Sequence, residues 1–140
     1  MHAETAGFYA HQMRRLDEGD AEGWAATFTE DAVFRISSRR QPMRGRAELT
    51  AGARAASDAV AAAGERLRHM TGMLEIEELP DEQMLVRATT LVYATDASGG
   101  ARLHQVCDCT DILVRTASAP RTFLVKDRRI DVLGHGPVPR

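Results

Sequence analysis

Three side chains able to exchange protons fall on neighbouring stretches of the C-terminal half of the chain. Tyr93 and His104 lie on either side of the turn sequence 97–100, so they can approach one another across a pair of adjacent strands. Asp108 follows His104 by an even number of residues and can share its face of the strand. A phenol, an imidazole and a carboxylate facing one cavity would suit ring closure or epoxide opening. An outer sheet face, used for solvation or for a dimer interface, would account for the same pattern.

A fourth group, the carboxylate of Asp17, ends the first expected helix. Gly19 suits the left-handed residue that terminates a helix, and Asp20 can cap the next helix by accepting a backbone N–H. A negative charge at a helix C-terminus opposes the helix dipole. That penalty hints at a role for Asp17 beyond the helix, with a solvated helix end as the alternative.

The fifth group is His69, at the start of the sequence HMTGMLEIE. Strict alternation would place its imidazole on the face opposite Leu74 and Ile76. A glycine inside a strand often marks a bulge, and a bulge at Gly72 would move His69 onto the face of these two apolar residues. We therefore predict a cavity-facing His69, with a histidine facing solvent or an interface as the alternative.

The elements that must position these groups follow from periodicity and turn chemistry. A helix is expected over about residues 3–18, and a second one starts after Asp20 and places Trp24 and Phe28 on one face. A strand at 33–36 precedes a third, alanine-rich helix at about 47–63, since alanine is the strongest helix former.

Long strands follow the helices. Alternating residues with turn sequences between them predict strands at 67–79, 84–95, 102–115 and 122–133. Strands joined by short turns pair antiparallel, so we expect a meander in a sheet of about five strands. The fold class is therefore α+β: a strongly curved, cone-shaped antiparallel sheet whose central cavity is closed by three N-terminal helices. Concave apolar cavities are the usual binding sites of small ligands.

The expected cavity wall combines apolar side chains of the helices and strands with one acid. The residues predicted to contact a substrate are Tyr9, Met13, Trp24, Phe28, Phe34, Met73 and Asp108. For Trp24, Phe28, Phe34 and Met73, simple membership of the core is the alternative.

Composition limits the possible partners and cofactors. The 140 residues predict one domain, 1–140, with a flexible tail from about 134. A net charge of −2 with interspersed signs gives no basic field for nucleic acid or anionic membranes. Cys107 and Cys109, the only cysteines, are too few for a zinc site and badly spaced for a disulfide. Without a signal sequence or long apolar run, the chain is expected to be soluble and cytoplasmic, with no metal.

The order of elements and several sequence words carry a family resemblance. LDEGDAEGWAATFTEDAVF, RGRAEL, RHMTGM and DILVR resemble the SnoaL-like branch of the nuclear transport factor 2-like superfamily over residues 5–133. The words MRRLDEGD and WAATFTEDAVF are similar to those of small actinobacterial proteins that tailor aromatic polyketides. The resemblance is specific for the fold, whereas the superfamily contains enzymes of several classes and non-catalytic partners.

The resemblance also implies roles for three residues. Dehydratase and dehydrochlorinase members carry a carboxylate near the end of the first helix that orients a histidine opening the strand after the third helix; Asp17 and His69 occupy those places. Such a pair suits proton abstraction from carbon, because the carboxylate holds the useful tautomer and stabilises the imidazolium. Arg128 lies near a cationic position of the family and would bind a substrate oxyanion. The paired tyrosines and second histidine of scytalone dehydratase are not recognisable here.

These patterns lead to one main functional hypothesis. We expect a cofactor-free enzyme that dehydrates, isomerises or cyclises a hydrophobic, aromatic or polyketide-like molecule, using His69 and Asp17 with Tyr93, His104 or Arg128 as stabilisers. The alternatives are a hydroxylase or epoxide hydrolase that uses Tyr93 and His104, and a non-catalytic dimeric binding module or oxygenase partner. Family resemblance and long strands with one face needing cover indicate a homodimer under every hypothesis.

Overall fold

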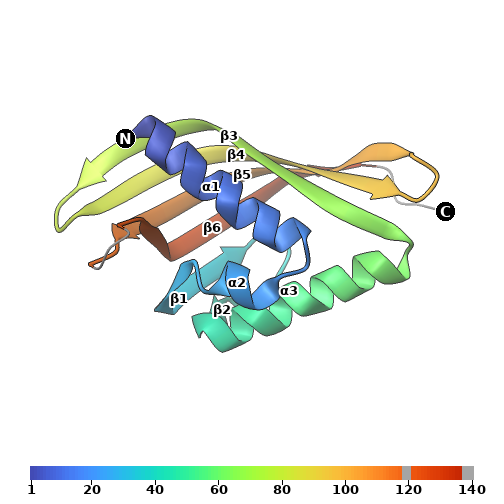
Figure 1. Ribbon diagram of the computed structural model, residues 1–140, viewed down its shortest axis with the longest axis horizontal. Coiled ribbons are helices and arrows are strands. Elements are labelled where there is room, and N and C mark those ends of the chain that lie inside the picture. Colours follow the sequence, from blue (N-terminus) through green and yellow to red (C-terminus); the bar gives the residue numbers. More distant parts are fainter. Residues whose placement is uncertain (118–120, 137–140) are drawn as a thin grey trace.

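The computed structural model describes residues 1–117 and 121–136 and shows an α+β fold with three helices and a six-stranded mixed sheet (Figure 1). In chain order the elements are α1 (His2–Asp17), α2 (Ala21–Ala25), β1 (Phe28–Ile36), β2 (Met43–Arg44), α3 (Gly45–Ala62), β3 (Glu65–Leu79), β4 (Gln83–Asp96), β5 (Ala101–Arg115) and β6 (Phe123–His135). None of the described helices is long and apolar enough to cross a membrane.

The sheet has the strand order β2-β1-β6-β5-β4-β3. The predicted meander is correct for β3 to β6, which pair antiparallel in sequence order. The expectation of a wholly antiparallel sheet is wrong, because β1 pairs parallel with β6. Register shifts interrupt four of the five pairings, and bulges of this kind bend strands. The long strands therefore arch over the helices (Figure 1).

The junction between α1 and α2 forms as the local chemistry predicts. Gly19 has a φ of 79°, in the left-handed region that favours glycine. The side chain of Asp20 accepts a hydrogen bond of 2.9 Å from the backbone N–H of Gly23 and so caps α2. The predicted second helix is too long, because α2 ends at Ala25 and Phe28 begins β1. The Trp24 and Phe28 rings still meet edge to face, with centroids 4.8 Å apart.

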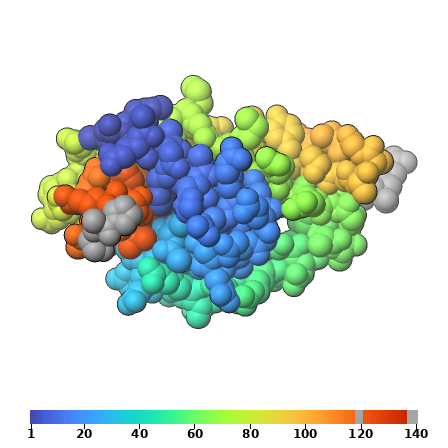
Figure 2. All heavy atoms as spheres, viewed as in Figure 1, coloured from blue at the N-terminus to red at the C-terminus, as the bar shows by residue number. Residues whose placement is uncertain are grey.

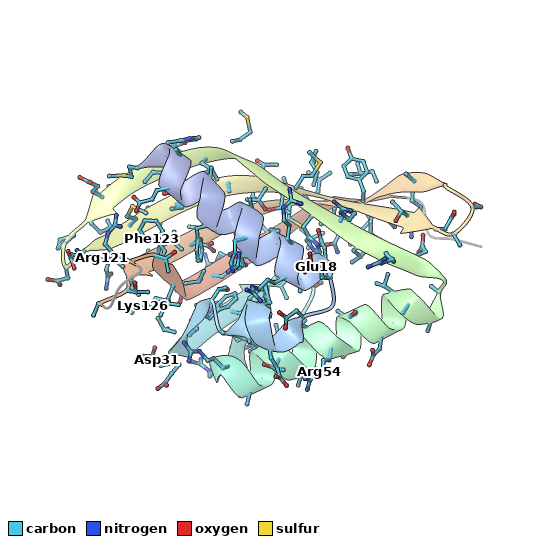
Figure 3. The ribbon with its side chains drawn as sticks, in the orientation of Figure 1. Glu18, Asp31, Arg54, Arg121, Phe123 and Lys126 are labelled. Carbon is cyan, nitrogen blue, oxygen red and sulfur yellow. The ribbon has the colours of Figure 1, made fainter. Side chains whose placement is uncertain are left out.

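The core lies between the helices and the concave face of the sheet. Its fully buried side chains include Phe28, Leu49, Leu113 and Val125, each 0% exposed. Phe123, labelled in Figure 3, lies at the start of β6, an inner strand of the sheet. Its ring packs edge to face against Phe8 and so ties α1 to the sheet. Burial of several large apolar side chains, each contributing roughly 1.5–3 kcal/mol, holds α1 across the sheet. Figure 2 shows the N-terminal helices covering the middle of this face.

The β3–β4 turn and the end of β6 can be compared with the turns and the tail predicted from the sequence. Asp81 and Glu82 both have positive φ angles and make the tight turn between β3 and β4. Strand β6 continues to His135, beyond the predicted start of the tail at 134. The last four residues of that predicted tail, and residues 118–120 of the predicted third turn, lie outside the described residues.

Candidate active site

The structure brings Asp17 and His69 together. Asp17 is the last residue of α1 and His69 lies in β3. A carboxylate oxygen of Asp17 is 2.6 Å from His69 Nδ1, and the same carboxylate accepts the backbone N–H of His69 at 3.1 and 3.2 Å. The two side chains are 10% and 18% exposed. Two independent contacts with one residue fix the direction of the carboxylate, so the imidazole is held in one orientation.

A bulge in β3 turns His69 inward. Between Gly72 and Glu75 the register with β4 shifts by one residue, and Met73 adopts a φ of 54°. The shift puts His69 on the face of Leu74 and Ile76, as the bulge hypothesis predicts. The residue in the left-handed conformation is Met73 rather than the glycine. Met73 is 87% exposed, so the prediction that it contacts a substrate is wrong for this chain.

The second ring nitrogen of His69 is free. A carboxylate only accepts hydrogen bonds, so in the neutral ring Nδ1 carries the proton and Nε2 has an unshared electron pair. Nε2 makes no hydrogen bond to residues 1–117 or 121–136. His69 lines a cavity of about 430 Å³ on the concave side of the sheet. The imidazole therefore offers a proton acceptor to whatever occupies that cavity.

The cavity wall is mostly apolar. All three helices and all six strands of the described residues contribute to it, and the predicted contacts Met13, Trp24 and Phe34 belong to the wall. Helix α3 contributes small side chains to the wall, such as those of Ala53 and Ala56. The polar lining residues are Ser38, Arg39, His69, Thr90, His104, Gln105 and Arg128, with the thiols Cys107 and Cys109. An apolar volume with a few convergent polar groups is typical of small-molecule sites.

Arg128 forms the polar centre of the cavity wall. It is 2% exposed and binds Asp111 through two hydrogen bonds, from Nε at 2.9 Å and from Nη2 at 2.8 Å. Nη2 also donates to Gln12 Oε1 at 2.6 Å, and Tyr9 donates its hydroxyl to Asp111 at 2.6 Å. Burial alone would lower the pKa of Arg128, but the Asp111 carboxylate and neighbouring groups outweigh it and raise that pKa further. The guanidinium stays charged.

One nitrogen of this guanidinium is left for a ligand. Arg128 Nη1 makes no hydrogen bond within the described part of the chain. Trp24 Nε1 is the only fully buried side-chain polar atom without a partner among the described residues, so Nη1 is not sealed in the core. Because Arg128 lines the cavity, its free N–H groups reach the cavity surface. The site thus combines a proton acceptor, His69, with a fixed cationic donor.

His104 reaches the same cavity by way of a second bulge. In the pairing of β4 with β5, Val92 opposes Gln105 and Tyr93 opposes Leu103, so His104 is the extra residue. Burial, followed by the charge of Arg102, lowers the pKa of His104. A neutral imidazole at pH 7 follows, able both to donate and to accept a proton.

The same bulge separates His104 from the partners that the sequence suggested. Tyr93 stands opposite Arg68 and Leu103, on the face of the sheet away from the cavity. Asp108 is exposed and pairs across the strands with Thr89, to which it is hydrogen-bonded at 3.4 Å. The predicted constellation of Tyr93, His104 and Asp108 is therefore not formed, because the extra residue reverses the alternation between positions 104 and 108.

Two further predicted contacts lie behind the wall. Tyr9 is 2% exposed and serves Asp111, and burial followed by the charge of Asp111 raises the pKa of its phenol well above the usual range. Phe28 is 0% exposed, and its ring packs against the rings of the cavity-lining residues Trp24 and Phe34. Both residues shape the site without lining the cavity.

Sequence reasoning missed Asp111 and Gln12, which hold Arg128. Asp111 interrupts an otherwise apolar strand end, DILV, and a buried acid there needs a cation on a neighbouring strand. Asp111 and Arg128 are direct partners in the β5–β6 register. The sequence did contain a signal: Asp111 and Arg128 have opposite charges and lie at similar distances from the predicted turn that joins their two strands. Among the described residues, no group of three or more histidine, cysteine or acidic side chains has the arrangement of a metal site.

Comparison with known proteins decides the family. Residues 2–127 match the model of the SnoaL-like domain. The chain belongs to the SnoaL-like family. This confirms the resemblance expected from the sequence, and the SnoaL-like protein has the NTF2-like, cystatin-like fold of that superfamily. A search of curated protein sequences gave no match.

Solved structures from actinobacteria resemble the SnoaL-like protein over most of its length. Aln2 from a Streptomyces species is 32% identical, with a TM-score of 0.83, over 94% of this chain and 89% of Aln2. ActVI-ORFA from Streptomyces coelicolor is 30% identical, with a TM-score of 0.84, over 94% and 96% of the two chains. A protein from Catenulispora acidiphila, solved in complex with S-DNPA, is 33% identical, with a TM-score of 0.78, over 94% and 92%.

Proposed function

We propose that this SnoaL-like protein is an enzyme that moves protons on a hydrophobic, aromatic polyketide-like substrate in the course of dehydration, isomerisation or ring closure. One observation carries the proposal: a histidine that is oriented by a carboxylate at 2.6 Å, and whose second ring nitrogen has no hydrogen bond to a described residue, lines an apolar cavity of about 430 Å³. General acid–base catalysis by a positioned side chain contributes roughly 10²- to 10⁴-fold to rate, and histidine performs it most often.

The geometry suggests how the first step proceeds. His69 Nε2 removes a proton from carbon next to a carbonyl group, and the electron pair of the C–H bond moves to the carbonyl oxygen. Asp17, 2.6 Å from Nδ1, stabilises the imidazolium that forms. Arg128 Nη1, fixed by Asp111 and Gln12, donates to the developing enolate oxygen. Pre-organised donors in a water-poor site are effective because they need no rearrangement during reaction.

The second step returns the proton. In a dehydration the enolate electrons expel a neighbouring hydroxyl group, which receives a proton from the His69 imidazolium and leaves as water. In an isomerisation the same proton goes to another carbon. Neither route changes the oxidation state of the substrate, so this scheme calls for no redox cofactor. His104, on the same cavity wall, is a second proton donor for a leaving group out of reach of His69.

Relatives support the substrate class. The Streptomyces and Catenulispora proteins are similar over almost the whole chain, and the Catenulispora protein was crystallised with the small molecule S-DNPA. The sequence resembles small actinobacterial proteins that tailor aromatic polyketides, and we assign this chain to the same chemistry. The apolar wall around Trp24 and Phe34 suits fused aromatic rings.

The two other hypotheses receive less support. A hydroxylase or epoxide hydrolase built on Tyr93 and His104 loses its constellation, since Tyr93 faces away from the cavity. A purely structural or binding module would not need a cavity-facing imidazole with a carboxylate behind it. Self-association remains part of our proposal, because Met70 and Leu103 are 62% and 37% exposed on the outer face. Gel filtration is expected to give a dimer, and a monomer would contradict this point.

The decisive experiment replaces His69. Wild-type protein is incubated in D₂O with a panel of aromatic hydroxy-ketones, and deuterium uptake at carbon and water loss are followed by mass spectrometry. His69→Gln should reduce both by about 10³-fold while leaving the melting temperature nearly unchanged, because glutamine fits the space but cannot take the proton. His11→Gln, on the exposed surface of α1, is the matched control. Equal rates in wild type and His69→Gln would refute the proposal.

A further inference from the structure

A row of side chains crosses the neighbouring strands β3, β4 and β5 on the concave face of the sheet (Figure 1). His69 of β3 is the direct partner of Val92 of β4, and Val92 is the direct partner of Gln105 of β5. All three residues line the cavity. The spacing of adjacent strands puts the backbones of His69 and Gln105 about 10 Å apart, with the small side chain of Val92 between them. A substrate group that lies on Val92 therefore has the imidazole on one side and the Gln105 amide on the other.

The bulge in β5 brings a second polar residue to this end of the cavity. Consecutive residues of a regular strand face opposite sides of the sheet. His104 and Gln105 are consecutive, yet both line the cavity, because His104 is the extra residue of the bulge. The cavity thus has a polar end, formed by His69 on one strand and by His104 and Gln105 two strands away.

One contact orients the Gln105 amide. The thiol of Cys107 donates to Gln105 Oε1 at 3.7 Å. Burial, followed by the charge of Asp108, raises the pKa of this thiol, so Cys107 stays protonated and acts as the donor. The amide oxygen therefore faces Cys107, and Gln105 Nε2 keeps two N–H groups that have no acceptor among residues 1–117 and 121–136.

These N–H groups differ from the other neutral donor close to His69. The hydroxyl of Thr90, two residues before Val92 on the same face, already shares a hydrogen bond of 2.9 Å with Thr71. The Gln105 amide has no such partner for its nitrogen. A polar group on an apolar wall gains free energy when it meets an acceptor, so a ligand with an oxygen atom at this place is favoured over one without.

We propose that Gln105 determines specificity: its Nε2 donates a hydrogen bond to a carbonyl or ring hydroxyl oxygen of the substrate and so fixes which carbon atom lies against His69. This oxygen differs from the one assigned to Arg128, so the substrate carries at least two oxygen functions. An uncharged amide suits a neutral oxygen, whereas carboxylates and phosphates are matched better by arginine. The inference rests on the proposed function for the reacting carbon, and adds the residue that selects it.

Two uncharged probes of the same shape test the hydrogen bond. 2-Acetylnaphthalene and 2-isopropenylnaphthalene differ only in that a carbonyl oxygen replaces a CH₂ group. Their affinities for the full chain are measured by fluorescence titration. Because the probes also differ in hydration, the quantity compared between proteins is the ratio of the ketone affinity to the alkene affinity.

Two variants of Gln105 should lower this ratio about fivefold, as expected for the loss of one neutral hydrogen bond. Gln105→Met replaces the amide by an apolar chain of similar length, and Gln105→Glu keeps the shape but removes both donors. Gln83→Met, at a glutamine of β4 that does not line this cavity, is the matched control and should keep the wild-type ratio. Thermal unfolding verifies that each variant is folded. A wild-type ratio in the folded Gln105 variants would overturn the proposal.

The position of deuterium uptake gives a readout that a merely structural role would not move. With a hydroxy-ketone that has two exchangeable carbon positions, the wild type in D₂O should label one of them. Gln105→Met should label both, and its KM should rise more than its kcat falls, because the substrate is held less firmly. Unchanged selectivity in this variant would contradict the assigned role.

Probe binding does not depend on turnover, so the two proposals fail separately. Equal turnover in wild type and His69→Gln, together with an affinity ratio that depends on Gln105, would refute the proposed reaction alone. Turnover that requires His69, together with an affinity ratio indifferent to Gln105, would refute the role of Gln105 alone.

Discussion

Two carboxylates, Asp111 and Asp17, each hold a side chain that lines the cavity, but they differ in burial and in what their partners are free to do. Asp111 is 0% exposed and receives hydrogen bonds from the Tyr9 hydroxyl, from two nitrogens of Arg128 and from the thiol of Cys109. Asp17 is at the rim and holds a histidine whose second nitrogen is free. The donors around Asp111 occupy both of its carboxylate oxygens, so this acid serves only to hold its neighbours. Asp17 instead orients the imidazole of His69, whose Nε2 can accept a proton from a ligand.

The difference teaches how rigidity and reactivity are divided in one site. A buried ion pair with a complete set of hydrogen bonds has a single arrangement, so it fixes Arg128 as a positioned donor. A partly exposed pair costs less to desolvate, and its histidine can gain and lose a proton without leaving an unpaired charge in the core. We infer that Asp111 acts on stability first and that Asp17 acts on rate first.

The largest expected effect follows from breaking the sealed pair. Asp111→Asn leaves the Arg128 cation in the core without its counter-charge, which should lower the free energy of unfolding by about 3–5 kcal/mol. Urea denaturation monitored by fluorescence measures the loss. Asp108→Asn, at the exposed acid three residues earlier, is the control and should change stability by no more than about 0.5 kcal/mol. Similar stabilities of the Asp111→Asn and Asp108→Asn variants would contradict the inference that Asp111 acts mainly on stability.

Asp17→Asn is expected to lower the catalytic rate while leaving stability nearly unchanged. Asparagine can still accept a hydrogen bond from His69 Nδ1, but it cannot stabilise the imidazolium, so kcat should fall by about 10²-fold. KM should change little, since Asp17 does not line the main cavity. Steady-state kinetics give both values, and thermal unfolding checks that the fold survives. A variant with normal kcat but strongly reduced stability would show that Asp17 is a structural acid like Asp111.

A smaller effect distinguishes the two tyrosines. Tyr9→Phe removes one donor from Asp111 and should cost about 1 kcal/mol of unfolding free energy. Tyr93→Phe, on the outer face, should leave stability and turnover unchanged, because its hydroxyl has no hydrogen bond to a described residue. Denaturation and activity assays on both variants supply the comparison. Loss of turnover in Tyr93→Phe would support the predicted site of Tyr93, His104 and Asp108, which the bulge in β5 separates here.

The smallest effect concerns pH. Burial, followed by the charge of Arg102, lowers the pKa of His104 in the folded protein relative to the unfolded chain. A lowered histidine pKa means that the unfolded state binds the proton more readily, so stability from this group is present above about pH 6.5 and is lost as the pH falls below that value. His104→Gln should therefore lose less stability than wild type between about pH 7 and pH 5. An identical pH slope of unfolding in the two proteins would contradict this assignment.

Local chemistry was enough to predict much of the frame. Gly19 and Asp20 are adjacent in sequence to the helices they separate, and a bulge near Gly72 follows from a glycine inside an apolar strand. The family words predicted the joint position of Asp17 and His69. In each case the information lies within a few residues, or within a motif that fixes a distant partner.

The misses have non-local causes. The parallel pairing of β1 with β6 joins residues more than 90 positions apart, and no turn sequence encodes it. Phe28 has helical spacing from Trp24, yet it follows Thr27 and is taken into the sheet by its partner Val125. The bulge at His104 contains no glycine, so alternation alone misplaced Asp108. Tertiary pairing overrides local periodicity at each of these points.

The state of the His69 ring tests the central claim most directly. A ¹H–¹⁵N long-range NMR spectrum of histidine-labelled protein, recorded where the ring is neutral, should show Nδ1 protonated and Nε2 bare, with the Nε2 signal shifting when an aromatic hydroxy-ketone is added. Asp17→Asn and His69→Gln provide the assignment. A proton resident on Nε2, or an Nε2 signal indifferent to the ligand, would mean that the imidazole does not present a base to the cavity.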